Sequence, residues 1–133
     1  MSEPLRLVRR TGWGDLFLLG PFAIPVVSAW LIDLLLRFND YLGLSGDAET
    51  GALLYMLANL MGIFAVSTAI MRLRAPSLDW AHATIAVKYS AAGIILFAVS
   101  QHAPAILALI AGGDLLIATL LLISVKRHGP ERG

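Results

Sequence analysis

The sequence predicts an all-α integral membrane protein, a four-helix antiparallel bundle that forms one domain over residues 1–133. Its hydrophobic share is 58% and its charged share is 14%, whereas soluble domains average roughly 45–50% and about 25%. The mean hydropathy is +0.78. Because a helix needs about 20 residues to cross a bilayer core, this length allows four crossings at most. A large soluble catalytic domain is therefore excluded.

Four apolar runs are each long enough to cross a membrane. They cover residues 16–36, 51–71, 80–99 and 103–125. The connections between them are short, with Pro76 in the second and Pro104 in the third. Short connections make neighbouring helices run in opposite directions, so we expect the four spans to be antiparallel.

The positive charges predict the orientation of these spans, because cytoplasmic flanks retain Lys and Arg. Eight basic residues fall on one side of the predicted topology: Arg6, Arg9, Arg10, Arg72, Arg74, Lys126, Arg127 and Arg132. The opposite flanks carry one basic residue among four acidic ones: Arg37 with Asp33, Asp40, Asp47 and Glu49. Both termini are therefore expected in the cytoplasm.

The first span contains two prolines, Pro21 and Pro25. Each removes a helical hydrogen bond, so the helix should bend or loosen between them. Such a bend is either a packing kink or a hinge that forms a cavity wall. A cleavable signal peptide ending near Ala29 is an alternative for this segment, but the hydrophobicity continues to Leu36, which favours a retained span.

Two ionisable residues lie deep within spans, where a charge costs about 2.5–3.5 kcal/mol on insertion scales. Lys88 lies about 14 residues before the corner near residue 102 and Asp114 about 12 after it, so their depths differ by about one helical turn. We expect them to form a salt bridge. Asn59 has a similar depth, and it would complete a hydrogen-bonded cluster with Tyr89 or Ser90 if the helices rotate suitably; the sequence does not assign its partners. The pair is either a structural clip between helices or, with Asn59, a ligand-binding or proton-handling site.

Other polar and aromatic residues lie near span ends. Asp15 is predicted to cap the start of a helix, and Asp33 and Arg37 are predicted to form a surface pair one turn apart. Four aromatic residues are expected to anchor the interfaces: Trp13, Trp30, Tyr41 and Trp80. Small residues follow Lys88 and precede Asp114, which favours close approach of the last two spans.

Several chemistries are excluded. The chain has no cysteine, so thiol catalysis and cysteine-ligated metals are ruled out. His82 and His102 are about 30 Å apart on one helix, too far to share a haem iron, and His128 lies in a polar tail. No nucleophile triad or phosphate loop occurs. We assign no catalytic residue and expect no metal, no cofactor and, at a net charge of +1, no nucleic acid.

Four short motifs are distributed over nearly the whole chain: residues 15–22 (DLFLLGPF), 59–62 (NLMG), 72–76 (RLRAP) and 113–116 (GDLL). With these motifs the chain resembles small four-helix bacterial inner-membrane proteins of the broad DoxX-like kind. Some members of that group resemble partner subunits of quinone-linked oxidoreductases. The resemblance implies a multi-pass protein of the bacterial inner membrane with an accessory role beside a quinone or lipid, and it carries over no functional residue.

Three classes of function remain open at this point. The favoured one is an accessory bundle that binds a lipophile, either lipid or quinone, with membrane lipids and a larger complex or a homo-oligomer as partners. The alternative is a proton-coupled small-molecule transporter or channel protomer that uses Lys88 and Asp114. A membrane enzyme lacks a catalytic set. The accessory role predicts a buried pair without a water path, whereas transport predicts a wet cavity.

Overall fold

The computed structural model describes residues 1–46 and 49–128, and all regular elements in these ranges are helical. The elements are α1 (Glu3–Leu19), the 3-10 helix η1 (Gly20–Ala23), α2 (Pro25–Tyr41), α3 (Ala52–Arg74), α4 (Leu78–Ser100) and α5 (Leu107–His128). The all-α class is confirmed. Helices α3, α4 and α5 are each long and apolar enough to cross a membrane, and the first two helices add a fourth candidate only as a bent pair.

The first predicted span, residues 16–36, is divided among three helices: it contains the end of α1, all of η1 and most of α2. The chain breaks after Leu19, and α2 leaves at an angle of 103° to the preceding helix. Pro21 is the second residue of η1 and Pro25 is the first residue of α2, both positions where a missing amide hydrogen is tolerated. The predicted bend at these prolines is confirmed, and it is sharp enough to separate two helices.

The helix before this break also begins earlier than the apolar run suggests. Helix α1 starts at Glu3 and is amphipathic: its buried positions are Pro4, Val8, Gly12 and Asp15, while Arg6, Arg9 and Arg10 are exposed. A search for continuous hydrophobicity misses such a helix, because only one of its faces is buried.

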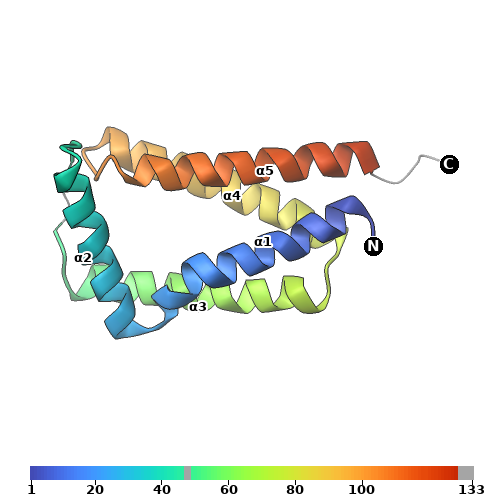
Figure 1. Ribbon diagram of the computed structural model, residues 1–133, viewed down its shortest axis with the longest axis horizontal. Coiled ribbons are helices and arrows are strands. Elements are labelled where there is room, and N and C mark those ends of the chain that lie inside the picture. Colours follow the sequence, from blue (N-terminus) through green and yellow to red (C-terminus); the bar gives the residue numbers. More distant parts are fainter. Residues whose placement is uncertain (47–48, 129–133) are drawn as a thin grey trace.

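The helices form two layers, one of α1 with α3 and the other of α4 with α5 (Figure 1). Contacts are most extensive within these two pairs, and α1 also contacts both helices of the second layer. Helix α2 runs between the layers at the end of the molecule opposite the N-terminus. The end of α5 lies near the N-terminus, where His128 Nε2 is 3.2 Å from a carboxylate oxygen of Glu3.

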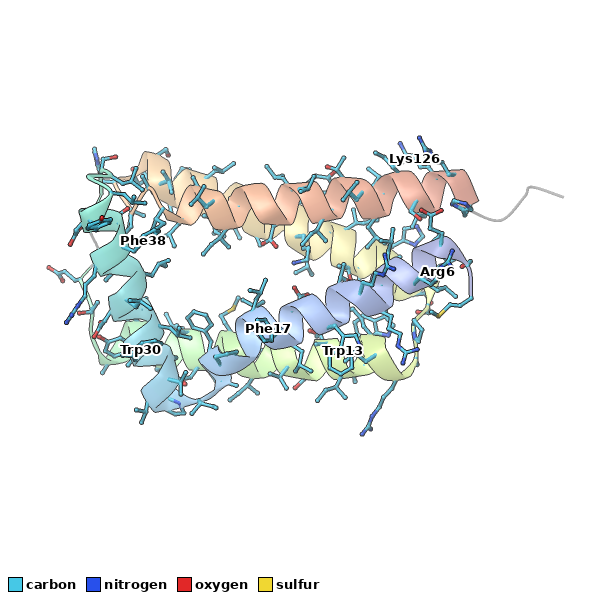
Figure 2. All side chains as sticks on the ribbon, in the orientation of Figure 1. Arg6, Trp13, Phe17, Trp30, Phe38 and Lys126 are labelled. Atoms are coloured by element: carbon cyan, nitrogen blue, oxygen red, sulfur yellow. The ribbon has the colours of Figure 1, made fainter. Side chains whose placement is uncertain are left out.

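Small residues fill much of the interior, and large apolar residues mostly face outward. Five alanines have no exposed surface: Ala69, Ala81, Ala92, Ala111 and Ala118. Val8, Ile85, Leu121 and Val125 complete an apolar cluster shared by α1, α4 and α5. Such small residues permit close helix approach, as expected for the last two helices. Phe17 is 82% exposed, and Figure 2 shows side chains projecting from all sides of the molecule.

Specific contacts fix the positions of η1 and α2. Gly62 of α3 lies against η1, and a Cβ atom there would collide with the backbone of Phe22 and Ala23. At the other end of α2, the buried Asn39 side chain donates hydrogen bonds to the carbonyl oxygens of Leu44 and Gly46. Its Oδ1 accepts a 3.1 Å hydrogen bond from the backbone amide of Ile106. Both ends of α2 are therefore fastened to neighbouring segments.

Candidate functional site

Lys88 on α4 contacts two carboxylates inside the bundle. Its Nζ is 2.7 Å from Oδ1 of Asp114 on α5 and 3.1 Å from Oδ1 of Asp15 on α1. Lys88 is only 7% exposed. The salt bridge expected between Lys88 and Asp114 is therefore present, because the antiparallel pair α4 and α5 brings the two residues to similar heights.

The second oxygen of Asp15 binds another cation. Its Oδ2 accepts a 2.7 Å hydrogen bond from Arg72 of α3, whose Nε also donates to the backbone oxygen of Thr68. Arg72, Asp15, Lys88 and Asp114 thus form a chain of alternating charge, which we call the charge network. Each of α3, α1, α4 and α5 contributes one residue to it.

The charge network is neutral as a whole, because two cations face two carboxylates. Two of its three contacts, both of 2.7 Å, have the length of charge-assisted hydrogen bonds, and the third, between Lys88 and Asp15, is longer at 3.1 Å. Removing charges from water is costly, and mutual attraction repays this cost only when the geometry is good and the remaining polar atoms are satisfied. Loss of a single member therefore leaves a buried charge without its partner.

The local sequence explains how Asp15 reaches its partners. Asp15 follows Val8 and Gly12 on the buried face of α1. Gly12 lies so close to α3 that an added Cβ would be 3.3 Å from the backbone oxygen of Ala69. This close approach brings the Asp15 carboxylate within reach of Arg72, which lies one turn after Ala69 on the buried face of α3.

Two members of the charge network were assigned differently from the sequence. Asp15 was expected to cap a helix start, but it lies inside α1, four residues before its end. Arg72 was counted with the basic flank, but its side chain is 5% exposed and points to Asp15. The periodicity of the buried positions on α1 is the signal that could have found Asp15, since it places this carboxylate in line with Val8 and Gly12.

Asn59 lies apart from the charge network. Its Oδ1 accepts a 3.3 Å hydrogen bond from Ser28 of α2, and its amide donates to the backbone oxygen of Tyr55. A contact with Tyr89 or Ser90 is not formed, because Asn59 faces α2. Tyr89 instead pairs with Thr119 of α5 at 3.0 Å. Asn59 therefore connects α2 with α3, and its role in ligand binding stays a prediction.

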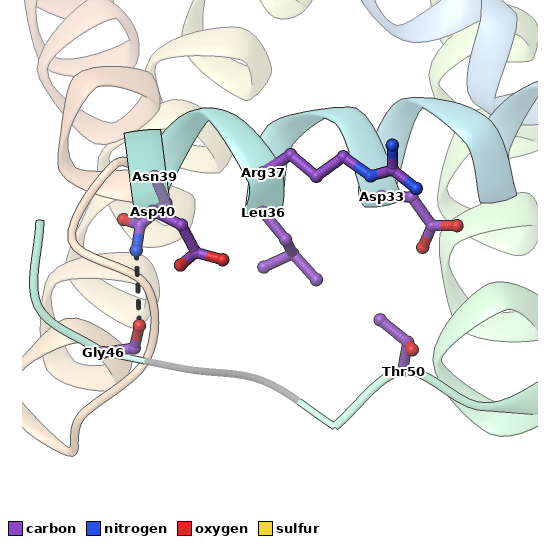
Figure 3. A pocket seen from close by; sticks show the side chains of 7 residues that line it. All are labelled: Asp33, Leu36, Arg37, Asn39, Asp40, Gly46 and Thr50. Atoms are coloured by element: carbon purple, nitrogen blue, oxygen red, sulfur yellow. Dashed lines mark hydrogen bonds between the residues drawn. The ribbon is translucent and has the colours of Figure 1, made fainter. Parts of the chain in front are cut away.

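An open pocket of about 270 Å³ lies beside α2 (Figure 3). Asp33, Arg37 and Asp40 line it with Asn39 and Thr50. Asp33 also accepts a 3.1 Å hydrogen bond from the hydroxyl of Tyr55. None of the lining residues belongs to the charge network, so pocket and network are separate features.

Within residues 1–46 and 49–128, no group of three or more His, Asp or Glu side chains is arranged to hold a metal ion. Asp47 and Arg132, which entered the charge-based orientation, lie outside the described residues. No protein family, curated protein or solved structure matches the chain. The resemblance to DoxX-like proteins therefore stays a prediction, and the charge network is the main candidate site.

Proposed function

We propose that the protein is an accessory bundle of a bacterial inner membrane that binds a lipophile, lipid or quinone, on its outer surface. In this proposal α1 with η1, α3, α4 and α5 cross the membrane as an antiparallel four-helix bundle with both termini in the cytoplasm. Arg6 and Lys126 lie at one end of the molecule and α2 lies at the other (Figure 2), which supports this orientation because basic flanks stay in the cytoplasm.

The observation that carries the proposal is the paired, neutral charge network. It links one residue of each proposed crossing helix, and every cation in it contacts a carboxylate. The two pockets beside α2 are lined by other residues. A buried network in which every charge has a partner of opposite sign suits a fixed internal frame better than a transport path.

The outer surface of this frame suits apolar partners. Large apolar side chains on several helices are more than half exposed, among them Phe17, Met61, Phe64, Ile94 and Phe97. Exposed apolar surface on this scale indicates contact with lipid or with another apolar molecule. Lipids, a quinone or a larger membrane complex are the partners that this surface fits.

The proposal is tested by purifying the protein in mild detergent and measuring retained lipids and quinones by native mass spectrometry. We expect at least one such molecule to remain bound per protein at detergent concentrations that strip an unrelated four-span control. Binding should persist in the Lys88→Met/Asp114→Leu double variant, because the network serves as frame. Complete delipidation of the folded native protein under these conditions would contradict the proposal.

A proton-coupled transporter or channel protomer that uses Lys88 and Asp114 is the second candidate. One observation favours it: the Asp114 side chain is 20% exposed, the highest value in the charge network. Ionisable residues with access to water or substrate are typical of proton pathways in membranes. Proteoliposomes loaded with a pH-sensitive dye provide the test, since a proton flux that Asp114→Asn abolishes would replace the accessory role by transport.

A further inference from the structure

Helix α2 differs in direction from the helices proposed to cross the membrane. The segment before it, Glu3–Ala23, packs along α3, and α2 turns by 103° at the break. It extends across the end of the two layers (Figure 1). If α3, α4 and α5 are roughly perpendicular to the membrane plane, α2 must lie nearly parallel to it.

The exposed face of α2 carries aromatic and apolar residues next to charges. Val26 and Tyr41 are 81% and 84% exposed, and three further large residues between them are exposed: Trp30, Leu34 and Phe38. Their spacing of three or four positions aligns them along one side of the helix. Asp33, Arg37 and Asp40 are also exposed and lie beside this row.

This mixture of side chains matches the boundary between headgroups and acyl chains. Trp and Tyr prefer this boundary because their rings are apolar and their tips form hydrogen bonds. Helices that lie in the membrane plane combine an apolar row with a charged row in the same way. Water alone would leave the row of Val26, Trp30 and Tyr41 without an apolar partner.

We propose that α2 is an interfacial helix that binds the phospholipid headgroup boundary on the side opposite the basic end, and that it does not cross the bilayer. Its occupant is the phospholipid itself, with Trp30 and Tyr41 in the headgroup layer and Arg37 beside the phosphates. This inference rests on the proposed crossing of the remaining helices and is independent of lipophile binding elsewhere.

The two possible orientations of α2 predict different depths along the helix. Val26 and Tyr41 are separated by fifteen positions, or about 22 Å of helical rise. An interfacial helix holds both residues at nearly the same depth, whereas a crossing helix separates their depths by most of this distance. Helix α4 provides the control for a crossing helix, because Ala83 and Phe97 are exposed on one side of it and are separated by about 21 Å of rise.

Site-directed spin labelling distinguishes these orientations in the full chain, which has no native cysteine. Single cysteines replace Val26, Trp30, Leu34, Phe38 and Tyr41 on α2, and Ala83, Val87, Ile94 and Phe97 on α4. Each labelled variant is reconstituted in phosphatidylglycerol–phosphatidylethanolamine vesicles. Depth is measured from the ratio of accessibilities to oxygen and to a water-soluble nickel chelate.

We expect the measured depth of the α4 labels to be greatest at the middle positions and smaller at Ala83 and Phe97, because depth from the nearer surface rises toward the bilayer centre from both ends of a crossing helix. All five α2 labels should fall within the headgroup layer. A depth maximum in the middle of α2 would overturn the proposal in favour of a crossing helix, and a steady increase in depth from Tyr41 to Val26 would overturn it in favour of a re-entrant one. Nickel access with little oxygen access at all five α2 positions would also overturn it, because the helix would then be in water or under another protein. A flat α4 profile would instead overturn the proposed crossing itself, so the two failures are distinguishable.

Discussion

Arg72 and Asp15 form a 2.7 Å ion pair between α3 and α1 although they are 57 positions apart in the sequence. Both residues are buried, and the pair extends through Lys88 to Asp114. Because α1 is only partly apolar, this contact supplies specificity that burial of α1 alone does not. The α1–α3 layer is therefore joined to the α4–α5 layer by charge as well as by the apolar cluster.

Replacing Arg72 by Met should destabilise the folded protein by about 3–5 kcal/mol, because Asp15 would lose one of its two cations in a buried position. Arg74→Met is the matched control, since Arg74 is exposed on the same helix and its loss should change stability by less than about 0.5 kcal/mol. Chemical denaturation in mixed micelles measures both variants. Equal effects of the two substitutions would show that the pair contributes nothing specific.

Lys88→Met should be more harmful than Asp114→Leu, because it removes the cation that two carboxylates share. The double variant Lys88→Met/Asp114→Leu retains the neutral pair of Arg72 and Asp15, so it should be more stable than Lys88→Met alone. We expect a coupling free energy of about 1–3 kcal/mol between the two sites. Thermal unfolding of the single and double variants followed by tryptophan fluorescence tests this, and additive losses would argue against a functional coupling of the charges.

Gly62→Ala should lower stability by about 1–3 kcal/mol, because overpacking forces neighbouring atoms to move and the obstructing atoms are the backbone of Phe22 and Ala23. Gly93→Ala is the control on α4, where an added Cβ meets no atom within 4 Å. That substitution should leave stability unchanged or raise it by about 0.5–1 kcal/mol through helix propensity. Melting temperatures in detergent give the comparison, and a neutral Gly62→Ala would mean that η1 does not pack closely on α3.

Asn39→Ala should destabilise the protein by about 1–3 kcal/mol, since it removes the partner of the buried Ile106 amide and two further hydrogen bonds to the carbonyl oxygens of Leu44 and Gly46. Asp40→Ala changes an exposed neighbour on the same helix and should be nearly neutral. Limited proteolysis of the segment after α2 provides the second measurement, because only loss of the Asn39 hydrogen bonds should accelerate cleavage there. Similar proteolysis of both variants would contradict the role of Asn39 as a tether.

The proposed orientation is tested by labelling single cysteines with a membrane-impermeant reagent in intact spheroplasts. Ser45→Cys should react, because Ser45 is exposed at the end of the molecule that carries α2. Ser2→Cys should react only after the membrane is permeabilised. Reaction of Ser2→Cys in intact spheroplasts would place the basic end outside and reject the orientation.

The sequence predicted those features that depend on composition, on prolines or on the number of residues between a side chain and a turn. Hydropathy predicted the helices that became α3, α4 and α5. Counting outward from the corner near residue 102 predicted the contact of Lys88 with Asp114, since depth in an antiparallel pair depends only on the distance from the turn. Pro21 and Pro25 predicted the bend, because proline restricts the backbone in any context.

Features that depend on helix rotation or on distant contacts were beyond the sequence. When helices are located only as continuous apolar segments, Asp15 and Arg72 both fall at segment ends and resemble flanking charges. Their pairing depends on how closely α1 approaches α3 at Gly12. The partners of Asn59 could not be assigned, because depth alone does not determine which face of α3 it occupies. The angle of the break was also not predictable, since it is held by Gly62 on α3 and by Asn39 near α5.

The charge network divides into two neutral halves that coincide with the two helix pairs, and this division has a consequence for biogenesis. Asp15 and Arg72 belong to α1 and α3, while Lys88 and Asp114 belong to α4 and α5. An unpaired charge at the centre of an inserting helix costs about 2.5–3.5 kcal/mol, which applies most directly to Lys88 and Asp114, since Arg72 lies in the last turn of α3. A partner of opposite charge on the neighbouring helix offsets this cost. Each helix pair therefore has no net charge at these positions, and only the Asp15–Lys88 contact links the charges of one pair to those of the other.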